Sequence, residues 1–437
     1  MLSMSHNTKR KLTAKLAIAA AIFAMLPATA GVVLGQDNKD KKDKKKFVTL
    51  ADVDKPNIQY KNIYKDLDLS KFVWPNPPAI TRIRYVNFWS GEKLDLSQQQ
   101  GQKKKNSWME RVSGVTVGGS NAETKPRWQL IVPNGIAVDS KGKVYIADSK
   151  VRAIFIVNLE TGAYEMIKNG EQANFKWPSG LAMDDSDRLF ASDPGMHRVL
   201  VFGPNHKVEA TISQGLVAPA GVAVDDENRL LYVADPEQDQ VFVFDADPPH
   251  KKIRAMGTPG QAHKLTTPGD FAKPVGVAVD NDGNLYVTDT FNNRVEIFDA
   301  DGNFIRQFGK NGDGVGYFAR PKGIAIDADG HVWVTDSVQE RVQVFTPEGK
   351  VLIWMGGQGL LPGRFSALEN VTIDKKNRVF TTEQYPGRLQ YFRYTTDAEA
   401  KAEKDQRDQD LKKNGQQRAA VNKAAEGQKP ESPSPQK

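Results

Sequence analysis

The chain has 437 residues, no cysteine and a formal net charge of +7 at pH 7. The absence of cysteine excludes disulfide bonds, thiolate metal sites, covalently attached c-type haem and a bacterial lipoprotein anchor. Hydrophobic residues make up 39% of the chain, and its 36 glycines and 24 prolines are typical of many short strands joined by tight turns.

The first 30 residues have the order of regions of a secretory signal peptide. Four basic residues precede the apolar segment 16–26, and small residues follow at 28–30. We therefore expect an exported protein, periplasmic or extracellular, that has no transmembrane span once the signal is cleaved. The alternative is a retained membrane anchor, because the apolar stretch 16–34 is nearly long enough to span a bilayer, although Pro27 interrupts it.

Cleavage after residue 30 lowers the formal charge from +7 to +3, because the removed segment contains four basic residues and no acidic ones. A nucleic-acid-binding protein needs a concentrated basic face. The charge balance and the predicted export therefore exclude nucleic acid as a partner.

Residues 31–80 are predicted to form a lysine-rich spacer and an irregular extension. The run 37–46 is dominated by lysine, and the part up to residue 80 is rich in Pro, Asn and Lys. Runs of like charge are usually solvated and disordered. We expect the folded domain to begin at about residue 81.

An internal repeat occupies the middle of the chain. The same seven-residue phrase, Pro-x-Gly-aliphatic-Ala-aliphatic-Asp, occurs six times at intervals of 41 to 55 residues, with a degenerate last copy. The six copies end at Asp139, Asp184, Asp225, Asp280, Asp327 and Asp374. Each is followed by a second apolar segment that ends in a carboxylate, and then by a third and a fourth β-like segment.

The pattern within each repeat predicts four strands. Runs such as Gly-Val-Ala-Val lack polar alternation, so both of their faces are expected to be buried, whereas the outer segments alternate. Four strands per unit of about 45 residues are typical of a β-propeller blade. Residues 81–396 are therefore predicted to form an all-β, six-bladed β-propeller.

The sixth repeat has no fourth strand of its own, because the chain becomes polar after about residue 394. Two earlier β-like segments, 82–88 and 108–112, are candidates to supply it and so to close the ring. We favour 108–112, since it directly precedes the first repeat. The polar segment 397–437 is predicted to be a disordered tail, with a polar helix as the alternative for its first part.

The phrase, the aliphatic-Tyr-Val-x-Asp strand and the Asn-Asn-Arg-Val sequence at 292–295 resemble NHL repeats. The resemblance covers residues 130 to 394 and is strongest in repeats four and five. It implies a bacterial, exported six-bladed propeller that presents a binding surface.

The carboxylates that end the second strands allow two interpretations. In a ring they could surround a central metal ion, or each could accept hydrogen bonds within its own loop. An arginine five residues later in four repeats favours the second interpretation. The carboxylates are Asp148, Asp193, Asp235, Asp289, Asp336 and Glu383, and the arginines are Arg198, Arg294, Arg341 and Arg388.

A resemblance to gluconolactonase-type propellers implies a different site. Those enzymes hold a divalent ion in the central channel with Glu, Asn and Asp ligands. Here Glu369, Asn370 and Asn134 lie on the segments that enter first strands, so they are the candidate ligands for a Ca²⁺ or Zn²⁺ ion. The amidating lyases with NHL-like repeats use several histidines and disulfides, and this chain departs from both features.

The sequence leads to three functional hypotheses. The favoured one is a non-enzymatic scaffold that binds a protein or peptide partner in the cell envelope through the four arginines, Asn292 and Asn293. The second is a divalent-metal-dependent lactonase or lyase that uses the channel. The third is an accessory subunit of a larger periplasmic complex.

Overall fold

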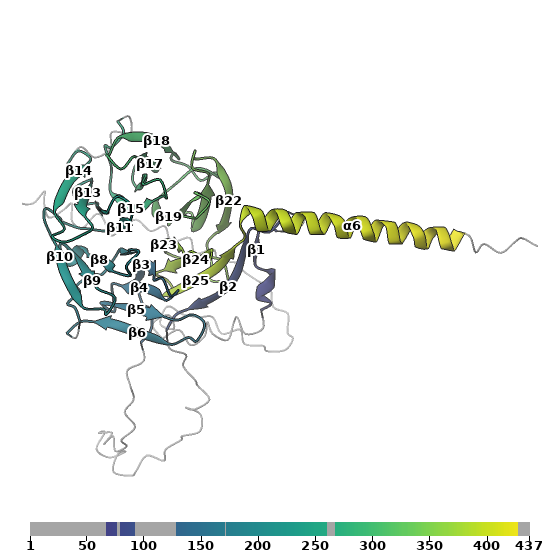
Figure 1. Ribbon diagram of the computed structural model, residues 1–437, viewed down its shortest axis with the longest axis horizontal. Coiled ribbons are helices and arrows are strands. Elements are labelled where there is room, and N and C mark those ends of the chain that lie inside the picture. Colours follow the sequence, from purple (N-terminus) through teal and green to yellow (C-terminus); the bar gives the residue numbers. More distant parts are fainter. Residues whose placement is uncertain (1–66, 77–78, 92–127, 171, 260–266, 427–437) are drawn as a thin grey trace, which may run out of the picture. The chain divides into compact units, whose positions relative to one another are not determined.

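The computed structural model describes residues 67–76, 79–91, 128–170, 172–259 and 267–426. The predicted signal peptide, most of the lysine-rich spacer, the segment 108–112 and residues 427–437 lie outside this part of the chain. Within it, six antiparallel sheets follow one another around a ring (Figure 1), and no helix is long and apolar enough to cross a membrane. The predicted six-bladed, all-β propeller is confirmed.

Blades one to five each contain four strands in chain order. Blade one consists of β3 (Pro133–Val138), β4 (Val144–Asp148), β5 (Ala153–Val157) and β6 (Tyr164–Lys168). Blade two consists of β7 (Leu181–Met183), β8 (Leu189–Asp193), β9 (Arg198–Phe202) and β10 (Val208–Ile212), with the 3₁₀ turn η2 (Pro194–Met196) before β9. Blade three consists of β11 (Val222–Asp225), β12 (Leu230–Asp235), β13 (Gln240–Asp245) and β14 (Lys252–Met256).

The later blades repeat this arrangement. Blade four consists of β15 (Pro274–Val279), β16 (Leu285–Asp289), β17 (Arg294–Phe298) and β18 (Phe304–Phe308). Blade five consists of β19 (Pro321–Ile326), β20 (Val332–Asp336), β21 (Arg341–Phe345) and β22 (Val351–Gly356). Blade six consists of β23 (Leu368–Ile373), β24 (Arg378–Glu383), β25 (Arg388–Tyr394), β2 (Ile83–Trp89) and β1 (Val73–Trp74), preceded by the 3₁₀ turn η1 (Leu69–Lys71).

The repeated phrase forms the first strand of each blade, and its glycine lets neighbouring blades approach. A Cβ on Gly135 would lie 2.2 Å from the carbonyl oxygen of Ser179 in the next blade, and the Gly135 N–H donates to that oxygen at 2.9 Å. Gly221 makes the same contact with Val275 at 2.9 Å. A side chain at these positions would clash with backbone, so the close packing around the axis requires glycine.

The core lies between the blades. Six clusters of buried side chains fill the six gaps between neighbouring sheets. Second strands such as Val144–Asp148 are buried along their whole length, because each faces a neighbouring blade on both sides. The aromatic residues that precede the phrase, among them Phe271, Phe318 and Phe365, are fully buried, as expected for packing between blades.

Blade six is closed by the N-terminal strand β2, which pairs with β25 from Ile83↔Tyr394 to Trp89↔Leu389. The predicted closure by an N-terminal strand is confirmed, but the preference for segment 108–112 is wrong. Ile83 and Trp89 bring apolar side chains to the clusters on both sides of blade six. The segment nearer in sequence to the first repeat does not pair with β25. A longer connection is tolerated because the entropic cost of closing a loop grows slowly with its length.

Two features extend the ordered structure beyond the predicted boundaries. At the N-terminal side, η1 and β1 precede residue 81, and β1 pairs with β2 as the outermost strand of blade six. At the C-terminal side, helix α6 (Asp397–Glu426) covers most of the segment for which the composition predicts disorder.

Helix α6 begins with a capping box, in which Glu399 N–H donates to Thr396 Oγ1 at 3.3 Å and Thr396 N–H donates to Glu399 Oε2 at 2.9 Å. Its first turns are held by ion pairs to β2 and β25, with Arg84–Glu403 at 3.1 Å and Arg393–Glu399 at 2.7 Å. The helix lacks an apolar face, so its attachment depends on cations that only the folded sheet brings near.

Candidate functional site

The central channel is a cavity of about 380 Å³ lined by the first strands of all six blades. We call the face at which these strands begin the upper face and the opposite one the lower face. The second residue of each phrase lines the upper end of the channel. These residues are Asn134, Ser179, Ala220, Val275, Lys322 and Glu369.

An ion pair between neighbouring blades occupies the upper end. Lys322 Nζ lies 2.5 Å from Glu369 Oε1, and the two side chains are only 24% and 16% exposed. Burial raises the pKa of Glu369, and the Lys322 ammonium opposes this shift. A cation of the protein itself therefore contacts the carboxylate that was the leading candidate for a metal ligand.

The two other candidate ligands, Asn134 and Asn370, line the same channel. Asn134 Oδ1 accepts a hydrogen bond from Gln384 Nε2 at 3.0 Å, and Asn370 Oδ1 accepts one from the Val371 N–H at 2.8 Å. The structure thus brings the three predicted residues to one cavity, as expected. Each already has a partner within the protein.

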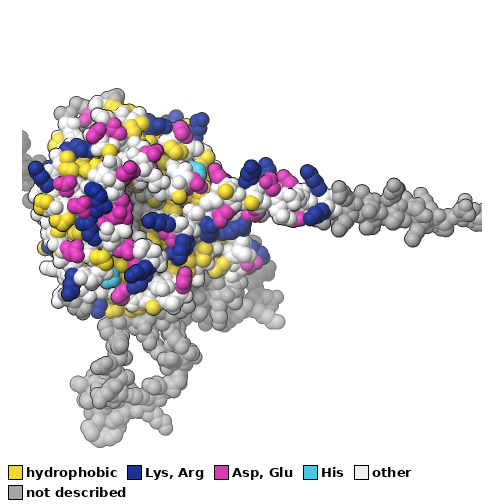
Figure 2. Space-filling model, viewed as in Figure 1, with side chains coloured by type: hydrophobic (Ala, Val, Ile, Leu, Met, Phe, Trp, Pro, Cys, Tyr) yellow, Lys and Arg dark blue, Asp and Glu magenta, His cyan; other side chains and the backbone are white. Residues whose placement is uncertain are grey.

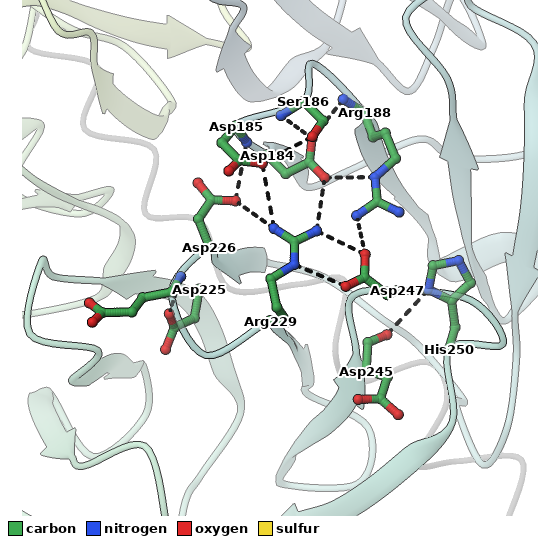
Figure 3. A network of polar contacts seen from close by, with 11 residues as sticks. Asp184, Asp185, Ser186, Arg188, Asp225, Asp226, Arg229, Asp245, Asp247 and His250 are labelled. Atoms are coloured by element: carbon green, nitrogen blue, oxygen red, sulfur yellow. Dashed lines mark hydrogen bonds and ion pairs between the residues drawn. The ribbon is translucent and has the colours of Figure 1, made fainter.

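A second group of carboxylates lies at the lower end, between blades two and three. Oxygen atoms of Asp184, Asp185 and Asp226 lie within 4.8 Å of one another. The Arg229 guanidinium contacts all three at 3.4 to 3.7 Å and also Asp247 at 2.9 Å (Figure 3). Burial and the nearby carboxylates raise the pKa of Asp226, whereas Arg229 and Arg188 lower that of Asp247.

The six carboxylates that end the second strands are fully buried and do not gather at the axis. Asp148 accepts hydrogen bonds from the N–H groups of Ile131 and Val132, and Asp193 accepts them from Lys176 and Trp177. The same bond pattern recurs around the ring. The interpretation that each carboxylate holds the loops of its own blade is confirmed.

The arginines predicted to contact a partner serve this internal network instead. Arg294 Nε donates to Asp289 at 2.9 Å and Arg388 Nε donates to Glu383 at 2.7 Å, while Arg341 Nη2 donates to the Asp313 carbonyl at 2.6 Å. These three side chains are buried, so the prediction that they form the binding surface is corrected.

The remaining predicted binding residues also support loops. Arg198 is half-buried and donates to the carbonyl of Asn174 at 2.6 Å. Asn292 is buried and donates to Asp289 Oδ2 at 2.7 Å, which fixes the loop between the second and third strands of blade four. Asn293 adopts a left-handed φ of 56° in the same loop, a conformation that asparagine tolerates.

The loops of the upper face instead expose large apolar side chains on every blade, and we call one of them from each blade the upper apolar ring; Met196, Val315, Tyr317 and Leu361 are further exposed apolar residues of these loops. Its members are exposed by 40% to 59%. They are Ile131, Trp177, Val217, Phe291, Val338 and Tyr385. Blades one to three supply theirs from the loop before the first strand, and blades four to six from the loop after the second strand.

Basic side chains accompany this ring. Arg320 lies over the ring of Phe291 at 5.7 Å from its centroid, and Lys176 lies over Trp177 at 5.2 Å. On the face shown in Figure 2, Lys and Arg are interspersed with Asp and Glu, without a patch of one sign. The sequence analysis missed the ring, because its members occupy two different loop positions and follow no strand periodicity.

Two family models match the chain. The NHL repeat model matches residues 318–345, and the model of the SMP-30/Gluconolactonase/LRE-like region matches residues 203–311. The NHL match falls on blade five of a ring with six such blades. The chain is a six-bladed β-propeller with an NHL repeat in blade five.

Relatives of this NHL-repeat propeller match only part of it. NHL repeat-containing protein 2 of Bos taurus is 28% identical over 177 residues, which are 39% of this chain and 21% of the relative. The gluconolactonase of Zymomonas mobilis is 25% identical over 196 residues, which are 38% of this chain and 52% of the relative. The chain therefore spans between a fifth and about half of the length of these curated relatives.

Solved structures are similar to the chain at low sequence identity. A streptogramin B lyase structure covers 61% of this chain and 94% of its own, with 13% identity and a TM-score of 0.46. At this identity the likeness concerns the propeller fold alone. The chemistry of this NHL-repeat propeller therefore has to be argued from its own residues.

Proposed function

We propose that this protein is an exported scaffold, periplasmic or extracellular, that binds a protein or peptide partner of the cell envelope and does not catalyse a reaction. The observation that carries the proposal is Lys322, whose ammonium lies 2.5 Å from Glu369, a carboxylate that lines the same channel as Asn370 and Asn134.

Lys322 opposes a divalent ion electrostatically. A divalent ion about 4 Å from an ammonium is disfavoured by on the order of 8 kcal/mol at an effective dielectric constant of about 20. An ion bound by Glu369 would therefore require Lys322 to move away or to lose its proton. At the lower end, the Arg229 guanidinium has the same effect on the Asp184, Asp185 and Asp226 carboxylates.

The upper apolar ring supports a docking role. Large apolar side chains exposed by half on six successive blades are unusual for a surface that contacts only water. Protein interfaces are enriched in aromatic residues and arginine, and Trp177, Phe291, Tyr385 and Arg320 are of these types. The ring thus replaces the buried arginines as the proposed contact surface.

The test is capture of a partner from an envelope extract. Replacing Trp177, Phe291 and Val338 together with Ser is expected to remove a stoichiometric partner from the captured material. A matched control replaces Val208 and Ile253, exposed apolar residues of outer strands, with Ser and is expected to retain it. Equal capture by both variants, at unchanged thermal stability, would contradict the assignment of the upper face.

A metal-dependent lactonase or lyase is the second candidate, because the SMP-30/Gluconolactonase/LRE-like model matches residues 203–311 and Glu369 lies in the channel. In this case Glu369, Asn370 and Asn134 would hold a Ca²⁺ or Zn²⁺ ion. Elemental analysis of the purified protein decides between the two candidates. One bound divalent ion per chain, lost in Glu369→Gln, together with hydrolysis of glucono-1,5-lactone, would overturn the scaffold proposal.

A further inference from the structure

The outermost strand of each blade presents an unpaired edge, which is a template for pairing with another chain. Proteins usually protect such edges with charged side chains, proline or a very short strand. Five blades of this protein follow that rule within the described residues. Their edge strands contain Glu165 (β6), Glu209 (β10), Arg254 (β14) and Arg306 (β18), and β1 has two residues followed by Pro75.

Blade five is the exception. Its edge strand β22 (Val351–Gly356) has the sequence Val-Leu-Ile-Trp-Met-Gly, with no charged residue. Three of its side chains, Val351, Leu352 and Trp354, are 37%, 50% and 44% exposed. The strand is thus apolar, exposed and unprotected against strand addition.

A groove runs along this edge. A cavity of about 830 Å³ lies between β22 and β1, which are neighbours at the rim of the ring (Figure 1). It is lined by the consecutive residues Leu352, Ile353 and Trp354. Because side chains of consecutive residues point to opposite faces of a sheet, a cavity that touches all three reaches the edge of the strand. It also touches Val344 of β21, the pairing partner of Ile353, so it borders the face of blade five that is turned toward blade six as well.

The other walls of the groove are also mainly apolar. Phe72, Val73 and Trp74 line it from the side of blade six, and Leu361 and Pro362 line it from the loop that follows β22. Leu361 is 50% exposed. An extended chain in this groove could therefore pair its backbone with β22 and place alternate side chains against Trp74 and Leu361.

The charges around the groove are mainly positive. Lys71, Arg82 and Arg364 line it, against the single carboxylate of Asp397. Arg82 is paired with Asp397, and Lys71 lies 3.6 Å from Asp68 in an ion pair whose side chains are 79% and 54% exposed, so solvent reaches the Lys71 ammonium. Acidic groups at the ends of a bound segment would complement this surface.

We propose that this groove binds an extended apolar segment of a partner protein, flanked by Asp or Glu, which adds along β22 as a fifth strand of blade five. Backbone pairing gives such complexes affinity, and pockets for alternate side chains give specificity. The site is separate from the upper apolar ring and does not depend on the function proposed for it.

The charge of the groove favours a segment of another protein as its occupant over a second copy or another segment of this chain. Two copies that met groove to groove would bring Lys71 and Arg364 of both chains together. Residues 37–66, which precede η1 in the sequence, contain nine lysines and six aspartates and so carry the same sign as the groove. An acidic segment of another protein is the complementary occupant.

The test is selection of twelve-residue peptides from a random phage-displayed library on the full-length protein. The expected peptides combine a run of β-branched or aromatic residues with Asp or Glu at one or both ends. A fluorescein-labelled synthetic copy is expected to bind in the micromolar range. Methylation of alternate backbone nitrogens, which removes strand hydrogen bonds, is expected to weaken binding at least tenfold.

The substitution Leu352→Lys places a charge in the unprotected edge and is expected to weaken binding of the same peptide at least tenfold. Leu361→Lys, in the neighbouring loop, is a second variant should the first fail to fold. Ile253→Lys is the matched control, because Ile253 is 45% exposed on β14, the edge strand of blade three. This control is expected to bind as the wild type does.

Four results would overturn the proposal. The first two concern the selection: no peptide family is enriched, or the enriched peptides have basic flanks. The other two concern the synthetic peptide: wild type, Leu352→Lys and Leu361→Lys bind it equally well, or its methylated form binds as tightly as the unmethylated one. Light scattering, which measures the oligomeric state, tests whether a second copy of this chain occupies the groove. A wild-type dimer that Leu352→Lys converts to a monomer would show that β22 pairs with a second copy instead.

Discussion

The two faces of the propeller use the same chemistry in different surroundings. Near the upper face, Glu383 and Arg388 form an ion pair in which the side chains are 0% and 2% exposed. At the lower face, Arg229 pairs with Asp247, and these side chains are 33% and 51% exposed. Each network joins carboxylates to a guanidinium, and only the access of water differs.

This difference teaches which charges hold the propeller together. A buried charge that loses its partner cannot be solvated, so removing one member of a buried pair is strongly destabilising. Charges at the surface regain water when a partner is lost, and their pairs contribute little. The upper network should therefore determine stability and the lower one should tolerate change.

The largest effect is expected from Arg388→Met, which leaves the buried Glu383 with hydrogen bonds from Gln390 and the Ser366 N–H but without a cation. Arg388 also donates to the carbonyls of Leu360 and Arg364, at 2.8 and 2.9 Å. We expect a loss of about 3–5 kcal/mol in the free energy of unfolding. Urea denaturation at pH 8 measures this free energy. A loss below about 1 kcal/mol would contradict the claim that the buried upper network determines the stability of the propeller.

An intermediate effect on stability is expected when the pH is changed, because Glu296 titrates. Glu296 is a buried carboxylate of blade four that accepts a hydrogen bond from the Gly269 N–H at 2.8 Å. Burial raises the pKa of Glu296 from 4.5 to about 7. Between these values the folded protein binds more protons than the unfolded chain, so stability falls as pH rises from about 4.5 to 7. The contribution lost is at most about 3 kcal/mol.

The matched variant for this prediction is Glu296→Gln. Glutamine is native at the equivalent position of blade five, where Gln343 accepts from the Gly316 N–H at 2.8 Å. Relative to wild type, the variant is expected to gain stability as pH rises from 5 to 8. Unfolding curves at several pH values test this, and a stability difference that does not change with pH would contradict the buried, raised pKa.

The smallest effect is expected from Arg229→Met at the lower face. Arg229 is a third exposed, three of its partners are about half exposed, and the buried fourth, Asp184, keeps its ion pair with Arg188 at 2.7 Å. We therefore expect a change within about 1 kcal/mol, smaller still at 1 M salt. Denaturation at low and high salt measures it. A loss as large as that of Arg388→Met would show that exposure does not separate the two networks.

Much of the fold could be predicted from the repeat. The phrase recurs six times, and each copy became the first strand of a blade, because its small and aliphatic residues fit only the crowded centre of a ring. The carboxylates after the second strands were correctly interpreted as loop supports, since a feature of every unit usually serves the unit.

The site was predicted only in part. Glu369, Asn370 and Asn134 do line one channel, but the contact of Glu369 with Lys322 was not anticipated. A signal existed in the sequence, because equivalent positions of consecutive repeats are neighbours in a ring, and these positions contain Lys and Glu in repeats five and six. The arginines were misassigned because a periodic arginine has the same pattern whether it is buried or exposed.

The sequence by itself thus determined the number of blades and the residues that build each one, since these depend on local patterns repeated along the chain. Tertiary structure alone decided that Ile83–Trp89 closes the ring, that Lys322 meets Glu369, and that β22 keeps an open edge. These contacts join segments far apart in the chain or in different blades. Which segments meet, and which edge stays open, depends on the surfaces that remain exposed after the blades have packed. A local sequence pattern does not encode this.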